Sequence, residues 1–399
     1  MTKISRREFG GIAFLATQAR SLFGAPKGID QTLSEGIVAR KIPLVSAMVA
    51  SANKTLYAGA FGAAKPDSIS SIASMTKPIT AVAAMQLVER GKLALDEPVA
   101  RHLPELTKLD VLEGFDGAGK PVLRPATKPI TLRHLLTHTS GFAYSVWHEG
   151  MFKYSQQFPI PQSVVAPLVP LAFEPGTRWQ YGYSADWTGK LVEAVSGLTL
   201  EDYFQKNILK PLDMNDTTFI LPREKFGRLV TQSRRQNGGP LQEVPKILPA
   251  PPKEFNGGGG LYSTTSDYVK FMQMILQYGR AGVRDEILKA KSVEMMMVNQ
   301  IGDLSAGKLK SYMPNTSSDV DLHPGAVDKW GLGFLINTTP YAGGRSAGSL
   351  AWAGIYNTFF WIDPPRGICA TIMMQFLPFV DKEAVALLGD FERSVYAAL

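Results

Sequence analysis

Residues 74–89 read SMTKPITAVAAMQLVE, a segment that joins reactive side chains to an apolar helical pattern. Its alanine, methionine, leucine and valine content predicts a buried helix from Pro78 to Glu89, ended at Gly91. Ser74 and Lys77 open this helix three positions apart, so their hydroxyl and amine share one face. A lysine amine is a recognised activator of the weak serine nucleophile, and a helix N-terminus favours developing negative charge. Ser74 is therefore a candidate nucleophile, with an N-cap role as the alternative.

Other serines match catalytic patterns in less suitable surroundings. The Ser-x-x-Lys spacing recurs at Ser51/Lys54, in a predicted hairpin turn, and at Ser305/Lys308, in a polar loop, so we expect both serines on the surface. Residues 344–348 read GRSAG, a formal match to the nucleophile elbow of α/β-hydrolases, which requires a histidine after its serine. The five histidines all precede Ser346 and are His102, His134, His138, His148 and His323. We therefore expect Ser346 to be a turn residue.

The two ends of the chain carry the strand patterns. A helix at 29–39 precedes a hairpin whose arms, 45–50 and 55–62, flank the turn at 52–54. The C-terminal part has β-branched and aromatic runs at 333–337, 349–356, 358–362 and 368–375, followed by a helix at 382–397. The middle of the chain shows mostly helical patterns. We expect an α+β fold in which both ends build one antiparallel sheet flanked by helices, with a mainly helical domain inserted.

Length and composition set the domain organisation. A chain of 399 residues is long enough for two or three domains. We expect a tail over 1–25, a sheet domain from 26–82 and 250–399, and a helical domain over 83–249, with the active site at their interface. Hydrophobic residues at 45% and charged residues at 19% exclude intrinsic disorder. The net charge of +7 is scattered along the chain, so we expect no nucleic-acid partner.

The N-terminus carries a possible export signal. Residues 5–9 read SRREF, and a short apolar stretch follows at 12–16, which resembles a twin-arginine signal. Gln18 and Arg20 interrupt the apolar stretch, so an amphipathic or disordered tail is the alternative. The localisation is therefore open between a bacterial cytoplasm and the periplasm. No run approaches the 18 or more apolar residues that a membrane helix requires, so we expect no membrane span.

Two further features suggest chemistry but have simpler explanations. His134 and His138 have the i, i+4 spacing of zinc helices, but the residues between them supply no glutamate and no third ligand cluster is evident. We expect His138 to satisfy buried backbone at a helix end, and we expect no metal and no cofactor. Cys369, the single cysteine, excludes an internal disulfide and lies in a predicted buried strand, where a thiol is most often inert.

Five ordered segments together resemble the serine β-lactamase and penicillin-binding-protein superfamily. After SMTKP at 74–78 come LLTHTSG at 135–141, EPGTRWQYGYS at 174–184, GGGLYST at 258–264 and WAG at 352–354. The form of these segments is especially similar to the family VIII carboxylesterases, the esterase branch related to class C β-lactamases. The resemblance implies a β-lactamase-like fold and a serine acyl-enzyme mechanism without a cofactor.

The resemblance also implies roles for individual residues. Ser74 would attack an ester carbonyl and become acylated, while Lys77 and Tyr181 would share the proton transfers. The backbone N–H groups of Ser74 and Ile355 would form the oxyanion hole, with Ile355 expected on an edge strand. Without the resemblance, Tyr181 would be interpreted as an aromatic wedge in a loop.

Two departures from the superfamily pattern concern the substrate. Tyr183 replaces the asparagine that helps β-lactamases hold the antibiotic's amide, and Trp352 replaces the lysine that pairs with its carboxylate. We expect Trp352, Ala353 and Gly354 to contact the substrate. An apolar pocket is expected to be lined by aromatic side chains chosen from Phe142, Tyr144, Trp147, Trp179, Tyr183 and Trp330. The alternative for each of these aromatic residues is a structural place in the hydrophobic core.

The sequence therefore predicts a serine carboxylesterase that acts on short-chain carboxylic esters, with slow cephalosporin opening as a side reaction. The partner would be a small-molecule ester, and the oligomeric state is left open. A class C-like β-lactamase or a D-alanyl-D-alanine carboxypeptidase is one alternative. A non-catalytic penicillin-recognition or scaffold protein is another.

Overall fold

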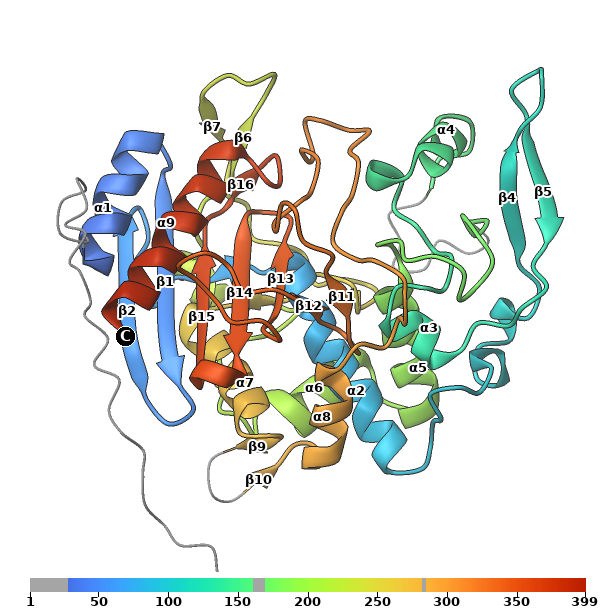
Figure 1. The fold of residues 1–399 in the computed structure, drawn as a ribbon, viewed down its shortest axis with the longest axis horizontal. Coiled ribbons are helices and arrows are strands. Elements are labelled where there is room, and N and C mark those ends of the chain that lie inside the picture. Colours follow the sequence, from blue (N-terminus) through green and yellow to red (C-terminus); the bar gives the residue numbers. More distant parts are fainter. Residues whose placement is uncertain (1–27, 161–168, 282–284) are drawn as a thin grey trace, which may run out of the picture.

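The computed structural model describes residues 28–160, 169–281 and 285–399 (Figure 1). The predicted N-terminal tail or export signal lies outside these residues. Within them, no helix is both long and apolar enough to cross a membrane.

A seven-stranded antiparallel sheet forms the centre of the fold, in the order β11-β12-β13-β14-β15-β1-β2. Its strands are β1 (Leu44–Ser51), β2 (Thr55–Gly62), β11 (Lys329–Trp330), β12 (Leu335–Ile336), β13 (Leu350–Gly354), β14 (Thr358–Asp363) and β15 (Ile368–Met373). The N-terminal hairpin joins the C-terminal strands where β1 pairs with β15, with Ala47 opposite Ile372. The predicted sheet built from both chain ends is therefore confirmed. The runs at 349–356 and 368–375 became strands because β-branched and aromatic side chains suit a buried pleated surface.

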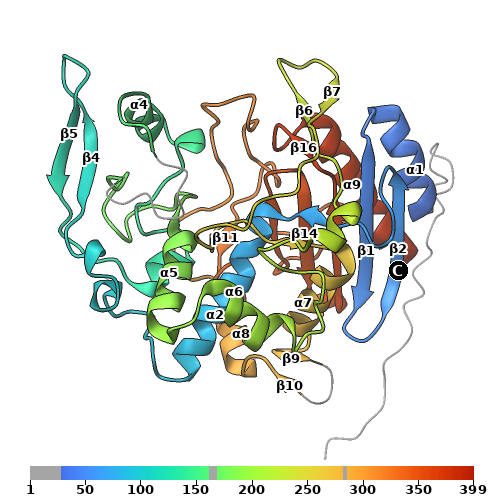
Figure 2. The same cartoon turned by 180° about the vertical axis from the view of Figure 1, so that it is seen from behind.

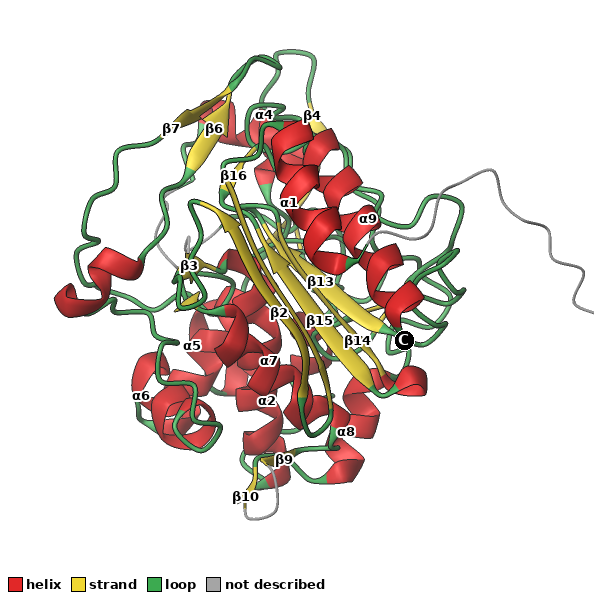
Figure 3. Ribbon diagram, turned by 90° about the vertical axis from the view of Figure 1, so that its left-hand side faces the viewer, coloured by secondary structure: helices red, strands yellow, loops and turns green. Residues whose placement is uncertain are grey.

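Helices cover both faces of this sheet (Figure 3). α1 (Ile29–Arg40) and α9 (Lys382–Ala398) lie together on one face, where Gly36 lets the backbone of α1 approach Leu387 closely. On the other face lie α2 (Thr76–Glu89) and α7 (Thr265–Leu276). Each residue of α2 from Thr76 to Leu87 is buried. A helix that is apolar on all sides is stable only inside a core, which explains its central position.

The remaining helices are α3 (Leu132–Leu136), α4 (Glu149–Gln157), α5 (Ser184–Ser196), α6 (Leu200–Phe204), which continues as a π-helical turn at Gln205–Leu209, and α8 (Ala290–Met297). α5 and α6 pack against α2, whereas α4 lies apart from it (Figure 2). The smaller strands are β3 (Ser70–Ser71), β4 (Asp110–Phe115), β5 (Pro121–Pro125), β6 (Ser233–Arg235), β7 (Leu241–Glu243), β8 (Tyr262–Ser263), β9 (Arg280–Ala281), β10 (Asp285–Glu286) and β16 (Phe376–Leu377). The boundaries of the two predicted domains stay a prediction.

One strand has a different place from the one expected. β13, which precedes Ile355, is the third strand of the sheet and not an edge strand. The expectation was wrong because β12 and β11 continue the sheet beyond it, with Leu335 opposite Ala351. Ile355 therefore lies in the tight turn between two buried strands.

Candidate active site

Ser74 lies in a short 3₁₀ turn, Ala73–Met75, that leads directly into α2. The residue before it, Ala73, has a φ of +44°, a backbone conformation that costs free energy for any residue other than glycine. The turn is held by α7, because the buried hydroxyl of Tyr268 in that helix donates to the carbonyl oxygen of Met75 at 2.9 Å. Ser74 is thereby held half-buried at the start of the central helix.

Lys77 is one turn further along α2 and only 3% exposed. Its Nζ donates to the Ser74 hydroxyl at 3.1 Å, to the carbonyl oxygen of Gly258 at 2.5 Å and to the Tyr144 hydroxyl at 3.4 Å. An ammonium group has three protons, so these acceptors match its full donor capacity. The predicted spacing of hydroxyl and amine on one helix face is therefore present in the structure.

The glycine run at 257–260 provides the backbone carbonyl that Lys77 contacts. The hydroxyl of Thr80, one turn beyond Lys77 on α2, donates to the carbonyl of Gly257 at 2.7 Å and holds this loop against the helix. A Cβ atom at Gly258 would lie 2.5 Å from Oδ2 of Asp186. Only glycine lets the loop come this close, which is the backbone approach that such a run indicates.

Tyr181, far from Ser74 in the chain, lies beside the pair. It is 2% exposed, and the centre of its ring lies 4.7 Å from Nζ of Lys77. Its hydroxyl accepts a hydrogen bond from Nε1 of Trp352 at 2.9 Å. The structure therefore brings Ser74, Lys77, Tyr181 and Trp352 together. The ammonium faces the ring of Tyr181, while the phenol oxygen is bound by the indole.

The end of β13 lies directly against the nucleophile turn. A Cβ atom at Gly354 would lie 2.3 Å from the carbonyl oxygen of Ile72, so the two backbones are in close contact here. Ile355 follows Gly354, so it lies next to a backbone that is in contact with the turn of Ser74. This arrangement suits a pair of backbone N–H groups that stabilise an oxyanion.

Asp186 and Tyr144 complete the polar surroundings of Lys77. The Tyr144 hydroxyl donates to Oδ2 of Asp186 at 3.3 Å, and it also accepts from Lys77. Asp186 is 1% exposed, and its Oδ1 has no hydrogen-bond partner among the residues that the structure describes. Burial raises the pKa of Asp186 to about 6, although the nearby charge of Lys77 opposes the shift. Burial and the carboxylate of Asp186 hold the pKa of Tyr144 well above its usual value.

Asp186 was not recognised as a site residue from the sequence. A carboxylate beside an ammonium in a buried site stabilises the cation, and it can also lose its own charge when its pKa is raised. The available signal was its position in the first turn of the apolar helix α5, five residues after Tyr181. Acidic residues are common at helix starts, so that position alone does not indicate a functional role.

His138 lies just beyond α3, in a left-handed conformation with a φ of +57°. The centre of its ring lies 4.7 Å from the ring centre of Tyr181 and 5.1 Å from that of Trp330. The expectation that its side chain satisfies backbone at a helix end was wrong. His134 does so, because its Nδ1 accepts from the amide of Thr131 in a capping box. Burial and the charge of Lys77 lower the pKa of His138 well below its usual value, which favours the neutral imidazole.

The residues predicted to contact the substrate differ in how deeply the structure buries them. Tyr183 is half-buried, with its ring 4.4 Å from that of Tyr144, and burial together with Asp186 raises its pKa to about 12. Phe142 is 4% exposed and stacks on Trp187 at 5.7 Å, so the structure places it in the core. Trp352, Ala353 and Gly354 are buried in β13. Among the remaining aromatic residues, Trp147 and Trp330 are buried and Trp179 is partly buried.

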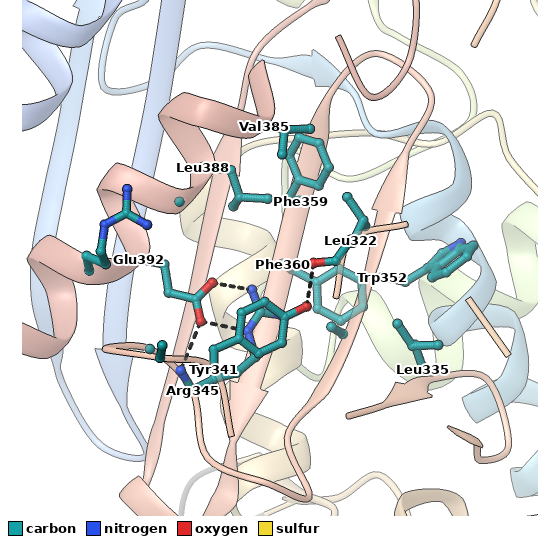
Figure 4. Close-up of a pocket in the computed structure, with 15 residues that line it drawn as sticks. Leu322, Leu335, Tyr341, Arg345, Trp352, Phe359, Phe360, Val385, Leu388 and Glu392 are labelled. Carbon is teal, nitrogen blue, oxygen red and sulfur yellow. Dashed lines mark hydrogen bonds and ion pairs between the residues drawn. The ribbon is translucent and has the colours of Figure 1, made fainter. Parts of the chain in front are cut away.

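A cavity of about 100 Å³ lies against α9, and Trp352 is one of the residues that line it (Figure 4). Its lining also includes the buried ion pair of Arg345 and Glu392, whose Nη2 and Oε2 are 2.6 Å apart. The neighbouring Ser346 lies in the loop before β13, where its amide donates to Asp363 at 2.9 Å. The GRSAG segment thus joins this loop to α9 and β14, as expected of a structural segment and not of a nucleophile elbow.

Comparison with known proteins is consistent with this geometry. A family described as Beta-lactamase matches residues 29–391. The chain is similar to ML-236A carboxylate methylbutanoyltransferase of Penicillium citrinum, with 31% identity over 97% of this chain and 98% of the relative. It is 31% identical to lovastatin esterase of Penicillium rubens, over 87% and 90% of the two chains. The structure of simvastatin synthase from Aspergillus terreus superposes with a TM-score of 0.80 and 30% identity, over 93% of this chain and 97% of that one.

Proposed function

Because the chain belongs to the beta-lactamase family, we propose that it is a serine carboxylesterase of the family VIII type. It would hydrolyse short-chain carboxylic esters through an acyl-enzyme on Ser74. The observation that supports this most strongly is the 3.1 Å contact between the Ser74 hydroxyl and the Lys77 amine at the start of a buried helix. The similarity to esterases and acyltransferases over most of the chain supports ester chemistry.

The first half-reaction forms the acyl-enzyme. The resting ammonium of Lys77 must first lose one proton to solvent. The neutral amine then takes the proton of the Ser74 hydroxyl as the serine oxygen attacks the ester carbonyl. The amides of Ser74 and Ile355 stabilise the negative charge that develops on the carbonyl oxygen. The bond to the alcohol then breaks, and the alcohol leaves with a proton delivered by Lys77 or Tyr181. The tyrosine suits this role because its oxygen accepts from Trp352 and its own proton stays available to donate.

The second half-reaction removes the acyl group. A water molecule attacks the acyl carbonyl, its proton passes to the Lys77 and Tyr181 pair, and the proton returns to the oxygen of Ser74 as that oxygen leaves. The carboxylic acid is released and the serine is restored. The short proton path between Ser74 and Lys77 serves both halves of the cycle.

The surroundings of Trp352 favour neutral esters over β-lactam antibiotics. The side chain is 4% exposed and its only polar group is bound to Tyr181, so position 352 offers no cation to a carboxylate. Losing a charged hydrogen bond of that kind costs about 1.5–3 kcal/mol in binding. An uncharged ester loses nothing, and cephalosporin opening is expected to be slow by comparison.

Acyl transfer to an alcohol is a second candidate function. The similarity to a methylbutanoyltransferase covers 97% of this chain, which favours an acyl-enzyme that an alcohol, and not only water, can resolve. The chemistry differs only in the final acceptor, because either hydroxyl can attack the acylated Ser74. The ratio of transfer to hydrolysis at rising alcohol concentration distinguishes the two functions.

The test combines p-nitrophenyl esters of increasing acyl length with intact-protein mass spectrometry. We expect a burst of p-nitrophenol and a mass increase equal to the acyl group, located on Ser74. Ser74→Ala should abolish both signals, whereas Ser346→Ala, the matched change at the other motif serine, should leave them intact. An adduct on another residue contradicts the proposed nucleophile. Failure to turn over any ester favours a non-catalytic role, and preferential turnover of a cephalosporin favours a β-lactamase.

A further inference from the structure

A small cavity beside Lys77 is lined by residues of α2, α3 and α5 together with His138 and Gly333. Its volume is about 10 Å³, and its polar lining residues are Lys77, Thr80, His138 and Thr188. A space of roughly 10–15 Å³ is the smallest that holds a water molecule, and such a water needs two to four polar partners. The size and the lining of this cavity both meet that requirement.

His138, which lines this cavity, carries a hydrogen-bonding atom that has no partner among the described residues. Its side chain is buried, with 2% exposed, and Nδ1 has no partner within the described part of the chain. A buried polar atom without a partner is rare in a native protein and commonly indicates an ordered water. Burial lowers the pKa of His138 and so favours the neutral imidazole, in which Nδ1 is an acceptor when the proton is on Nε2.

The other polar groups that line the cavity already have hydrogen-bond partners, but two of them can still accept a hydrogen bond from a water molecule. Lys77 already donates to three acceptors. The hydroxyls of Thr80 and Thr188 donate to the backbone carbonyls of Gly257 and Ser184, at 2.7 and 3.0 Å. Each hydroxyl oxygen keeps a lone pair that can accept. A single water can therefore donate one hydrogen to Nδ1 of His138 and the other to a threonine oxygen.

We propose that this cavity holds one water molecule and that His138, bound to it, is a positioning residue for Lys77 and Tyr181. This assignment rests on the proposed function, because it concerns how the same proton-transfer groups are held. The ring of His138 packs on Tyr181 at 4.7 Å, and the cavity that it lines also contains Lys77. Fixing the imidazole through the water fixes the surface on which the phenol rests.

The ring of His138 lies between those of Tyr181 and Trp330. Its ring meets Trp330 edge-on at 5.1 Å, and Trp330 in turn meets Trp352 at 4.8 Å. Trp352 donates to the Tyr181 hydroxyl. A rotation of the imidazole would therefore disturb Tyr181 both directly and through the two tryptophans, and small displacements of reacting groups are costly in rate.

Three variants test the assignment in the full chain. Thr188→Val keeps the side-chain shape and removes one water partner. His138→Leu removes the nitrogen acceptor, and His138→Asn restores a polar acceptor with a residue that tolerates a positive φ. We expect His138→Leu to lower kcat by about 10- to 100-fold with little change in KM. We expect His138→Asn to recover most of that loss and Thr188→Val to lower kcat by a smaller factor.

A crystal structure of the parent protein gives a readout independent of activity. We expect electron density for one water within hydrogen-bond distance of His138 Nδ1 and a threonine hydroxyl, absent in Thr188→Val or displaced there. An empty cavity overturns the water site. A parent-like kcat in both His138→Leu and Thr188→Val overturns the positioning role, as does a loss in His138→Leu that His138→Asn does not reduce. If the parent turns over no ester while the water is present, the proposed function fails and the water site stands.

Discussion

The indole Nε1 of Trp352 donates to the phenol oxygen of Tyr181 at 2.9 Å, although the two residues are 171 positions apart in the chain. Their rings are 4.8 Å apart, and both side chains are almost completely buried. Trp352 thus has two effects. It binds the phenol of Tyr181, which is proposed to transfer protons, and it replaces the lysine that β-lactamases carry at this position. A tryptophan is suited to this because it is a large apolar side chain with a single donor.

Trp352→Phe is expected to lower kcat for a neutral ester by about 3- to 10-fold, because a neutral hydrogen bond contributes about 0.5–1.5 kcal/mol. The change keeps an aromatic ring and removes only the donor and part of the ring area. Steady-state kinetics with a p-nitrophenyl ester measure the effect.

The chain offers a matched control for that variant. Nε1 of Trp361 donates to the hydroxyl of Tyr396 at 3.2 Å, in contact with α9 and away from Ser74. Trp361→Phe removes the same kind of bond and should reduce thermal stability without changing kcat. Equal losses of kcat in the two variants would show that the Trp352 contact has no specific role.

Trp352→Lys is expected to change substrate preference toward ligands that carry a carboxylate. The new ammonium can regain a charged hydrogen bond worth about 1.5–3 kcal/mol, which corresponds to roughly 10- to 150-fold in relative kcat/KM. The comparison is the ratio of cephalosporin to neutral-ester turnover in this variant and in Trp352→Met, which has a similar length and no charge. An unchanged ratio would mean that the lysine is not what separates this site from a β-lactamase.

Asp186→Asn is expected to stabilise the protein at neutral pH. Burial raises the pKa of Asp186 from 3.8 to about 6, so between these values the folded state binds more protons than the unfolded state. The contribution of this group to stability is therefore most favourable below pH 3.8 and decreases as the pH rises to about 6. The amide removes a penalty of up to about 3 kcal/mol at pH 7, a figure that already includes the opposing attraction to Lys77.

Urea unfolding between pH 4 and pH 8 measures this effect. The stability difference between Asp186→Asn and the parent should grow as the pH rises through 6 and then level off. Asp303→Asn, at an exposed position, should leave the pH dependence unchanged. A constant difference across the range would contradict the assignment.

Gly258→Ala is expected to reduce activity by about 100-fold, since a shift of about 1 Å in a reacting group has a cost of that order. The new methyl group would lie 2.5 Å from Oδ2 of Asp186, which would push away the carbonyl that Lys77 contacts. Gly259→Ala is the neighbouring control, because its nearest atom outside the adjacent residues is 3.7 Å away, an ordinary contact. Similar losses in both variants would indicate a general effect on the loop and not on Lys77.

Local sequence patterns were sufficient to predict much of the architecture and the pairing of Ser74 with Lys77 in the site. The hairpin at 45–62, the helices α1, α2 and α9, and the strands β13 to β15 lie where their apolar patterns place them. These elements are buried, so their sequences carry a strong periodic signal. The β4–β5 hairpin was missed because strands with exposed side chains, such as Val122 and Leu123, lack that signal.

The chain order alone determined that Ser74 and Lys77 share one helix face, because an i, i+3 spacing brings side chains together wherever the helix lies. Only the tertiary structure decided what surrounds them. Tyr144 reaches Lys77 across 67 positions, and the carbonyl of Gly258 does so across 181. Such contacts follow from how the segment around Tyr144 and the glycine loop pack on α2, and they depend on the shape of the whole core. No periodicity in a single segment encodes that shape.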